Sequence, residues 1–249
     1  MINYRRIHRM GISTLPIFLA LIPARKGSKG VSGKNTRVVG KKALIEYTIQ
    51  SALAVEELQK VFVSSDDCDV QRICKQYPVT FIDRPPDIAT DQATANEVIE
   101  HFIKKLPRQF QNKMTFILYL QPTSPLRTEE HIKQAIRMLY LSEVRSVISL
   151  TKLNKPIFKC FSIDQNGLVA SLFDEKLTNA SRQDLPQVYI PNGAIYAFSV
   201  DDFQQKGMIP SNGSSPLIMD KMESLDIDSE EDFEVLENYL VNQTRSDSQ

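Results

Sequence analysis

Strand-like and helix-like segments alternate along the first 150 residues. The strand-like runs are short, nearly continuous in apolar character and rich in Val, Ile and Phe, as in a sheet covered on both faces; they span 17–22, 60–65, 79–82, 115–121 and 146–150. Between most of them lie amphipathic stretches with apolar residues at helical spacing, over 43–55, 67–77, 93–106 and 128–141. This alternation predicts an α/β fold, a doubly wound and mostly parallel sheet.

The pattern changes after residue 151. Residues 151–190 contain short β-like pieces, turn residues such as Asn166-Gly167 and no crossover helix, and predict an inserted β-rich arm. The main fold resumes with a strand over 192–199, and a last helix over 229–240 begins at a cap, Asp228 or Ser229. We therefore expect one domain over 16–242 that carries the arm.

Charge and hydropathy exclude several functional classes. Thirty Lys and Arg balance thirty Asp and Glu, which disfavours a nucleic-acid partner. No run approaches the roughly 20 apolar residues of a membrane span. The basic start followed by an apolar run resembles a signal peptide, but the run is short and contains Pro16 and Pro23. We expect residues 1–15 to be a flexible extension of a cytoplasmic protein, and the odd count of three cysteines agrees with free thiols.

A cationic loop follows the first strand directly. Residues 22–35 read IPARKGSKGVSGKN, with three glycines that let the backbone bend and four cations, Arg25, Lys26, Lys29 and Lys34. Because ligands of open α/β sheets bind beyond the carboxyl ends of the strands, this loop suits a polyphosphate. It is not a Walker A loop, since Asn35 follows Gly33-Lys34. The alternative is a solvated basic turn, and Lys26 and Lys29 fit that description equally well.

Five motifs in order resemble those of the acylneuraminate cytidylyltransferases, the family that makes CMP-sialic acids and related CMP-nonulosonates. They are ARKGSKGVSGKN (24–35), RPPDIATDQAT (84–94), LQPTSPLRT (120–128), RQDLPQVYIPNGAIY (182–196) and SLDIDSEEDF (224–233). The resemblance implies a nucleotidyltransferase-like fold, with the arm forming a homodimer. It also implies a reaction in which the anomeric hydroxyl of a nine-carbon 2-keto sugar acid attacks the α-phosphorus of CTP and pyrophosphate leaves.

Nucleotide contacts follow from the resemblance and from residue chemistry. Arg25 and Lys34 are expected at the triphosphate, with Ser28 assisting, and Asn35 at the ribose. The family implies that Arg84 contacts the cytosine, and that the backbone near Ala93 and Thr94 completes base recognition. Arg84 could instead make a surface ion pair with Asp83 or Asp87.

Asp226 and Asp228 are the expected Mg²⁺ ligands. Their spacing on an extended chain points both carboxylates the same way, and the resemblance assigns them to the metal. The alternative is the N-terminus of the last helix, where acids are common. Arg25, Lys34 and Asp228 are the expected catalytic residues, and Glu230, Glu231 and Asp232 the first-turn acids of that helix.

The sugar acid is expected to meet residues from several segments. The resemblance places Gln121 on the sugar, while Lys159 or Arg182 could bind its carboxylate. Tyr196 either hydrogen-bonds the sugar or is a core tyrosine, and Arg127 could support its loop through hydrogen bonds. Met208-Ile209 stands where many family members carry paired phenylalanines for the N-acyl group, which favours a different acyl sugar such as legionaminic acid.

Two other functions are compatible with parts of the sequence. Asp226-Ile227-Asp228 is an Asp-x-Asp motif of the kind found in sugar-nucleotide glycosyltransferases, which usually carry it mid-chain and do not need the cationic first loop. A non-catalytic nucleotide-binding relic is the other, although it would not need to retain Arg25, Lys34, Asp226 and Asp228 together.

Overall fold

The computed structural model describes residues 15–27, 30–111, 114–141, 144–155 and 157–246. Of the expected extension, residues 1–14 lie outside the described ranges, and Ser28 lies outside them as well. Seven strands form one sheet in the order β11-β7-β10-β6-β1-β4-β5, in which β10 alone runs antiparallel to its neighbours. These strands span β1 Ile17–Pro23, β4 Leu58–Ser65, β5 Thr80–Asp83, β6 Thr115–Tyr119, β7 Ser146–Lys152, β10 Tyr189–Ser199 and β11 Ser215–Met219.

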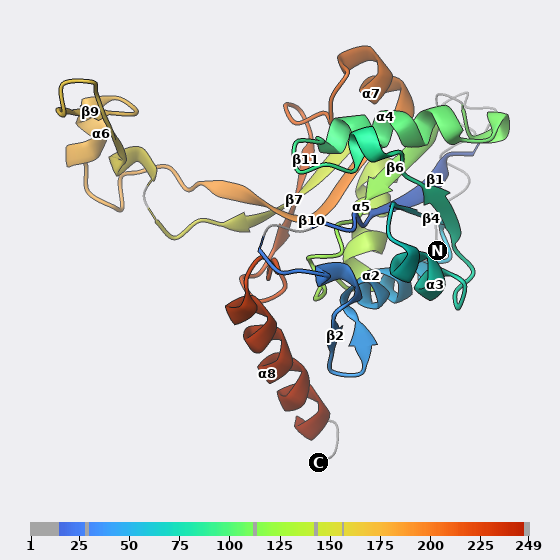
Figure 1. Ribbon diagram of the computed structural model, residues 1–249. Helices are drawn as coiled ribbons and strands as arrows, with labels where there is room; N and C mark the ends of the chain where they lie inside the picture. The colour runs from blue at the N-terminus through green and yellow to red at the C-terminus, as the bar shows by residue number, and fades with distance from the viewer. Residues whose placement is uncertain (1–14, 28–29, 112–113, 142–143, 156, 247–249) are drawn as a thin grey trace.

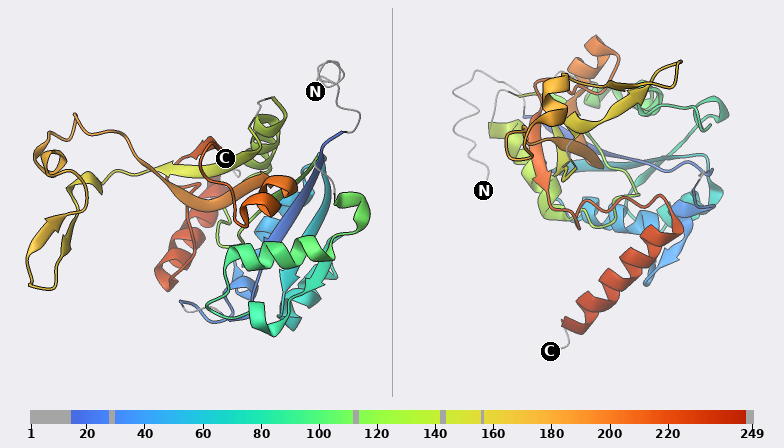
Figure 2. Two further views of the ribbon diagram at one scale, coloured as in Figure 1. Left: turned by 90° about the horizontal axis from the view of Figure 1, so that it is seen from above. Right: turned by 90° about the vertical axis from the view of Figure 1, so that its left-hand side faces the viewer.

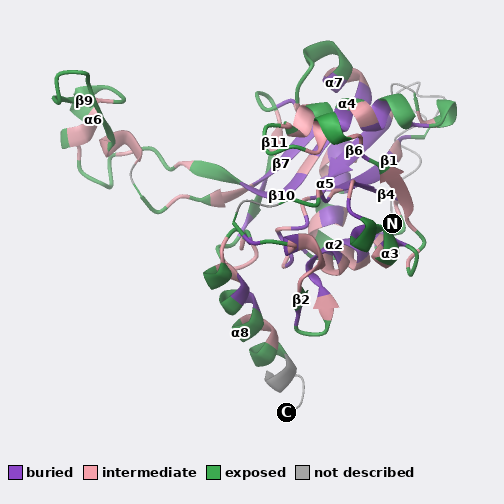
Figure 3. Cartoon of the chain, viewed as in Figure 1, coloured by how far each residue is buried: buried purple, intermediate pink, exposed green. Residues whose placement is uncertain are grey.

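Helices cover both faces of the sheet (Figure 1). On one face lie α2 (Leu44–Leu53), α3 (Cys68–Cys74) and α5 (Glu129–Leu141); on the other lie α4 (Ala95–Lys105) and α7 (Val200–Lys206). Strand β1 is apolar throughout because it is covered on both faces. Ala20 and Ile22 pack in the core under α2, α3 and α5, whereas Leu19 and Leu21 pack in the core under α4 and α7. The doubly wound α/β prediction is confirmed, and Figure 3 shows the burial concentrated in this sheet.

Three helix starts follow the local sequence. Asp67 caps α3 by accepting from the Asp69 N–H. Thr94 and Glu97 form a capping box at the start of α4. At α8 (Glu230–Ser246) the cap is Ser229, whose Oγ accepts from the Asp232 N–H at 3.3 Å. The carboxylate of Asp228 is therefore not used as a cap.

The segment between β7 and β10 leaves the body as an arm (Figures 1 and 2). It contains a two-stranded sheet, β8 (Phe161–Ile163) with β9 (Val169–Ser171), and a short helix α6 (Glu175–Asn179). Gly167 has a φ of 78° in the turn between the two strands. Large apolar side chains on the arm are exposed, among them Ile163 (74%) and Val169 (71%). An arm with so little core of its own presents an apolar surface to solvent.

Several elements were not predicted from the sequence. They are the hairpin β2 (Val38–Val39) and β3 (Lys42–Ala43), helix α7, strand β11, and single turns at Lys34–Thr36, Pro86–Ile88, Arg108–Phe110 and Ile157–Lys159. Strand β6 ends at Tyr119, two residues before the expected end, so Gln121 lies just beyond it. Among the described residues, no helix is both long and apolar enough to cross a lipid bilayer.

Candidate functional site

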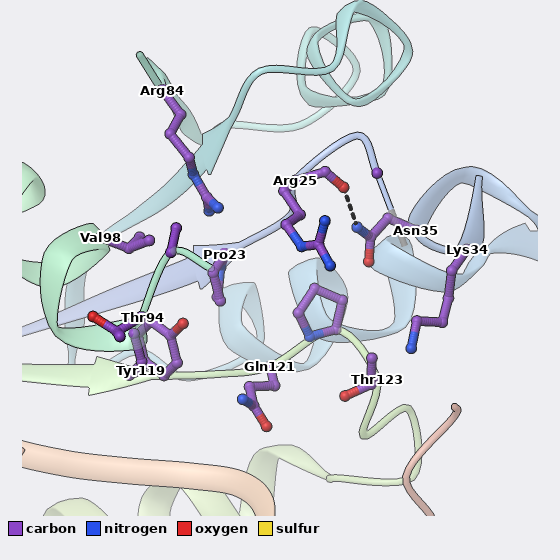
Figure 4. A pocket seen from close by; sticks show the side chains of 14 residues that line it. Pro23, Arg25, Lys34, Asn35, Arg84, Thr94, Val98, Tyr119, Gln121 and Thr123 are labelled. Carbon is purple, nitrogen blue, oxygen red and sulfur yellow. Dashed lines mark hydrogen bonds between the residues drawn. The ribbon is translucent and has the colours of Figure 1, made fainter. Parts of the chain in front are cut away.

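A cavity of about 280 Å³ opens at the carboxyl ends of the parallel strands. Three strand ends each contribute a side chain directly beyond them: Arg25 after β1, Arg84 after β5 and Gln121 after β6. The N-terminus of α4 adds Thr94, and Figure 4 shows these groups approaching one space from different elements. The full lining is Pro23, Arg25, Gly27, Lys34, Asn35, Arg84, Ala93, Thr94, Ala95, Val98, Tyr119, Gln121, Pro122 and Thr123.

Local contacts hold the cationic loop in place. Asn35 donates from Nδ2 to the carbonyl of Arg25 at 3.0 Å, which closes the loop on itself (Figure 4). Lys34 is 8% exposed, and its Nζ donates to the carbonyl of Ile227 at 2.6 Å and pairs with Asp228 Oδ1 at 2.9 Å. The side chain at the end of the loop therefore contacts the segment that carries the two expected metal ligands.

The Asp226–Asp228 segment is packed tightly against this loop. Ile227 is fully buried in a small core with Val31 and Phe233, and its N–H donates to the carbonyl of Thr123 at 2.8 Å. A Cβ on Gly30 would come closer to the Asp228 carbonyl oxygen than the 3.0 Å below which real Cβ atoms essentially never lie. Only glycine allows the loop backbone to approach this far.

The cations of the pocket differ in how they are neutralised. Arg25 pairs with Asp91 at 2.6 Å, and Lys34 pairs with Asp228. Arg84 is 4% exposed and donates to the hydroxyl and carbonyl oxygens of Ser64, at 3.2 and 2.8 Å. Burial is the main cause that lowers its pKa. The local positive charge suits an anionic ligand.

The alternative in which Arg84 makes a surface ion pair is wrong. Its side chain is buried, and the ion pairs within the described ranges include none between Arg84 and Asp83 or Asp87. The two prolines that follow Arg84 start a turn at Pro86–Ile88, which leaves the guanidinium directed into the cavity (Figure 4).

Asp226 and Asp228 offer the oxygen ligands that a hard cation prefers. Asp226 is an exposed residue, but the protein near its carboxyl group raises its pKa, and the charge of Asp228 raises it further. A hydrogen bond with Thr123, at the pocket wall, acts in the opposite direction. Neither carboxylate lines the cavity itself, but both lie next to lining residues, Asp226 beside Thr123 and Asp228 beside Lys34, and two mutually repelling carboxylates are a donor set that fits Mg²⁺.

A different acidic group is explained by helix capping. Asp67, Cys68 and Asp69 form the one cluster of three potential metal-binding side chains found in the part of the chain that the structure describes. Asp67 caps α3, and Asp69 makes an ion pair with Arg72. These contacts account for the cluster without a metal.

The expected sugar contacts do not all lie at the pocket. Gln121 lines it, whereas Tyr196 lies behind the lining residue Tyr119, with ring centroids 6.5 Å apart. Burial and the neighbouring Asp226 raise the pKa of Tyr196. Lys159 lies on the arm at its Ile157–Lys159 turn, and Arg182 follows α6 there; neither lines the pocket of its own chain. Met208-Ile209 is also absent from the lining; Ile209 packs on the core under α7.

Sequence reasoning missed three residues of the pocket region. Tyr119 ends β6 on the side facing α4, and its burial raises its pKa to about 12, so it stays a neutral hydroxyl. Thr123 follows Gln121 and connects the pocket to Asp226. Asp91 pairs with Arg25 from the loop before α4. The period of two along β6 is the signal that could have identified Tyr119.

The chain resembles known proteins over most of its length. The family model described as Cytidylyltransferase matches residues 19–245. The chain is 36% identical over 218 residues to the N-acylneuraminate cytidylyltransferase of Escherichia coli O18:K1:H7, covering 87% of this chain and 50% of that protein. It is 33% identical over 230 residues to the CMP-N,N'-diacetyllegionaminic acid synthase of Legionella pneumophila, covering 89% of this chain and 95% of that protein. It is 30% identical over 219 residues to the pseudaminic acid cytidylyltransferase of Campylobacter jejuni, covering 87% of this chain and 93% of that protein.

Solved structures agree on the fold. CMP:2-keto-3-deoxy-manno-octonic acid synthetase complexed with CTP superposes with a TM-score of 0.68 at 14% identity, over 91% of this chain and 99% of that one. The chain spans about half the length of the N-acylneuraminate cytidylyltransferases that it matches. From the family model and from relatives of at least 30% identity that it covers almost completely, we conclude that the chain belongs to the cytidylyltransferase family.

Proposed function

We propose that this chain is a cytidylyltransferase that transfers CMP from CTP to the anomeric hydroxyl of a nine-carbon 2-keto sugar acid and releases pyrophosphate. The observation that carries the proposal is the cationic cavity at the strand ends, which brings together Arg25, Lys34, Arg84 and Gln121 from segments far apart in the sequence. The family membership and the names of the relatives support the reaction class. The same membership disfavours an Asp-x-Asp glycosyltransferase.

The nucleotide would lie along the cationic loop. Arg25 and Lys34 would neutralise the triphosphate, and Asn35, fixed by its bond to the Arg25 carbonyl, would face the ribose. Arg84 would reach the cytosine from the opposite wall, and Ala93 and Thr94, which also line the pocket, would complete base recognition. Such a site aligns the α-phosphorus and stabilises charge without forming a covalent bond to the protein.

Asp226 and Asp228 would hold Mg²⁺ at the edge of this pocket. Bound there, the ion supplies charge neutralisation for the phosphates. The chain prepares the position through the buried Ile227, which fixes the segment, and through Thr123, which hydrogen-bonds Asp226. Lys34 already binds Asp228, so binding of the phosphates would share the ammonium between two anions.

The arm gives a reason to propose a homodimer. Its exposed apolar side chains need a partner, and Lys159 and Arg182 lie on it away from the pocket of their own chain. We propose that the arm docks on a second copy and presents these cations to the sugar carboxylate in the partner pocket. Because the reaction consumes CTP, we expect it to take place in the cytoplasm.

The deciding experiment measures pyrophosphate release with CTP and Mg²⁺. N-acetylneuraminate, legionaminate, pseudaminate and ketodeoxyoctulosonate would be tested in parallel, and UTP or ATP would replace CTP to test the base assignment. Release with a nine-carbon acid and CTP is the expected result. CTP binding without release from any of the sugars would instead favour the relic.

Mixing two variants tests the shared pocket. Lys34→Met disables the pocket of its own chain, and Arg182→Ala would disable the pocket of its partner. After subunit exchange, half of the dimers would be mixed, and each would hold one intact pocket, which restores up to about a quarter of wild-type activity. No recovery, with exchange verified by mass, would contradict the arm's role at the partner pocket.

A further inference from the structure

Gly193 occupies a bulge in β10 directly beside Gln121. The register between β10 and β7 shifts between Pro191 and Tyr196, and Gly193 has a φ of 77° within this irregular stretch. A Cβ at this position would approach Gln121 Oε1 to less than 3.0 Å. The present orientation of the Gln121 side chain therefore requires a residue without a side chain at 193.

The bulge is fixed by buried polar contacts. Asn192 is 6% exposed, and its Oδ1 accepts from Ser149 Oγ at 2.6 Å and from the Ala194 N–H at 3.2 Å. Its Nδ2 donates to Ser224 Oγ at 2.8 Å. Because both sides of Gly193 are held in this way, its backbone cannot move aside easily to make room for an added side chain.

Arg127 links the segment that carries Gln121 to the segment that carries Gly193. It is 2% exposed, and its Nη1 donates to the carbonyl of Gln121 and to the carbonyl of Ala194, both at 3.0 Å. Its Nη2 donates to Thr48 on α2 at 2.6 Å. One nitrogen thus links the residue that faces the pocket to the residue that follows Gly193.

The acceptors that the described residues offer to Arg127 are all uncharged: the carbonyls of Gln121 and Ala194 and the hydroxyl of Thr48. The ion pairs found among the described residues do not include Arg127, and its Nε has no hydrogen-bond partner there. An uncompensated buried cation is costly, so its retention needs a reason beyond packing. A planar donor that can bind two carbonyls at once is such a reason, and lysine would not reproduce it.

We propose that Gly193 and Arg127 are positioning residues that set the orientation of Gln121 and thereby the affinity for the sugar acid. Arg127 fixes the backbone of Gln121, and Gly193 leaves the space into which its carboxamide turns. The carboxamide makes no hydrogen bond within the described residues, so it is available to a ligand. This inference rests on the proposed function only in taking the ligand to be the sugar acid.

The test is Gly193→Ala with steady-state kinetics for each substrate. The KM for the sugar acid should rise on the order of tenfold or more, because a displacement of about 1 Å at a binding group has effects of that size or larger. The KM for CTP should change less than about twofold, since its contacts lie on other elements. Gly213→Ala is the matched control: Gly213 has a φ of 83°, so alanine is equally strained there, but an added Cβ would meet nothing within 4 Å.

A double-mutant cycle separates positioning from a general structural effect. In a Gln121→Ala background, Gly193→Ala should add less than about twofold to the KM for the sugar acid, since the group it displaces is gone. Arg127→Lys should behave in the same way. Increases that multiply in the double variants, or an unchanged KM in Gly193→Ala alone, would overturn the proposal.

A crystal structure of Gly193→Ala tests the positioning role of Gly193 independently of the proposed reaction. If the wild-type protein released no pyrophosphate with any sugar, the proposed reaction would fail, and the position of Gln121 would still be measurable. Gln121 Oε1 displaced from its wild-type position, in an otherwise unchanged backbone, supports the positioning role. An unmoved carboxamide refutes it.

Discussion

Replacing Lys34 by methionine tests the central cation of the pocket. Methionine keeps an apolar stem of similar length and removes the ammonium, which now contacts the Ile227 carbonyl and Asp228. The substitution therefore separates the charge of Lys34 from the space that its stem fills. It should lower both the stability and the activity, by amounts that can be worked out separately.

The loss of stability should be small. Ile227 is fully buried, and leaving its carbonyl without a donor costs about 1–3 kcal/mol. The ion pair adds less than about 1 kcal/mol, because the Asp228 side chain is 75% exposed. The two costs together are about 1–4 kcal/mol, so for a chain of this size the melting temperature should fall by roughly 2–16 °C. Typical stabilities are about 5–15 kcal/mol, so the variant should remain folded.

The loss of activity should be much larger. Removing one preorganised donor that stabilises transition-state charge typically lowers kcat by about 10² to 10³. The assay is pyrophosphate release at a temperature well below the melting transition of the variant, with the melting curve recorded on the same sample. Lys26→Met is the control, because it removes the same charge from the same loop but at an exposed side chain.

The kinetics of the folded Lys34→Met variant show whether the ammonium of Lys34 acts in catalysis or only in anchoring the Ile227 carbonyl. If Lys34→Met kept kcat/KM within about tenfold of the wild type, the ammonium would serve to anchor Ile227 and not to bind phosphate. If Lys26→Met lost as much activity as Lys34→Met, net loop charge would explain the effect and the assigned position of Lys34 would be wrong.

Substitutions at three residues around the pocket give further testable outcomes. Gly30→Ala should lower kcat/KM by about 10², because relieving the clash of the new Cβ with the Asp228 carbonyl moves the loop by about 1 Å. The helix content should change little, and wild-type kinetics would contradict this reasoning. Thr94→Ala should lower the melting temperature by about 2–4 °C through loss of about 1 kcal/mol of capping, and Thr94→Ser should not. Thr94 also donates from its N–H and Oγ1 to the Glu97 carboxylate, and these bonds lower the pKa of Glu97. The part of the difference that comes from the Oγ1–carboxylate bond is present above pH 4.5 and is lost as the pH falls through the folded-state pKa, so the gap between the melting curves of wild type and Thr94→Ala should narrow at low pH but not close. Arg127→Met should destabilise the chain by about 2 kcal/mol or more, measured by urea unfolding, because two buried acceptors and one half-buried acceptor lose their donor.

Local pattern was enough to predict the part of the fold built from repeated strand–helix units. The apolar runs of β1, β4, β5, β6 and β7 lie within one or two residues of the observed strands, because a strand buried on both faces has an unmistakable composition. The direction of β10 and the place of β11 were not accessible in this way. Each is a single strand whose neighbours in the sheet are distant in sequence, and pairing depends on contacts that no local window contains.

The site was predictable where chemistry follows a strand end and not where it depends on tertiary contact. Arg25, Arg84 and Gln121 each follow a strand and all line the pocket. The pairing of Lys34 with Asp228 joins residues 194 positions apart, and no spacing rule points to it. Tyr196 was left open between sugar and core, and its place behind Tyr119 depends on an antiparallel pairing that appears only in the folded sheet.

The way in which the arm joins the body has a consequence for how this fold can vary. The chain leaves along β7 and returns along β10, and these strands are hydrogen-bonded neighbours up to the pair Tyr189 and Lys152. The two junctions are thus closed by the sheet itself, whatever the segment between them contains. Arms of different length or surface can be exchanged at this point at the modest entropic cost of a surface loop, so the segment between the junctions can change without altering the sheet that carries the pocket.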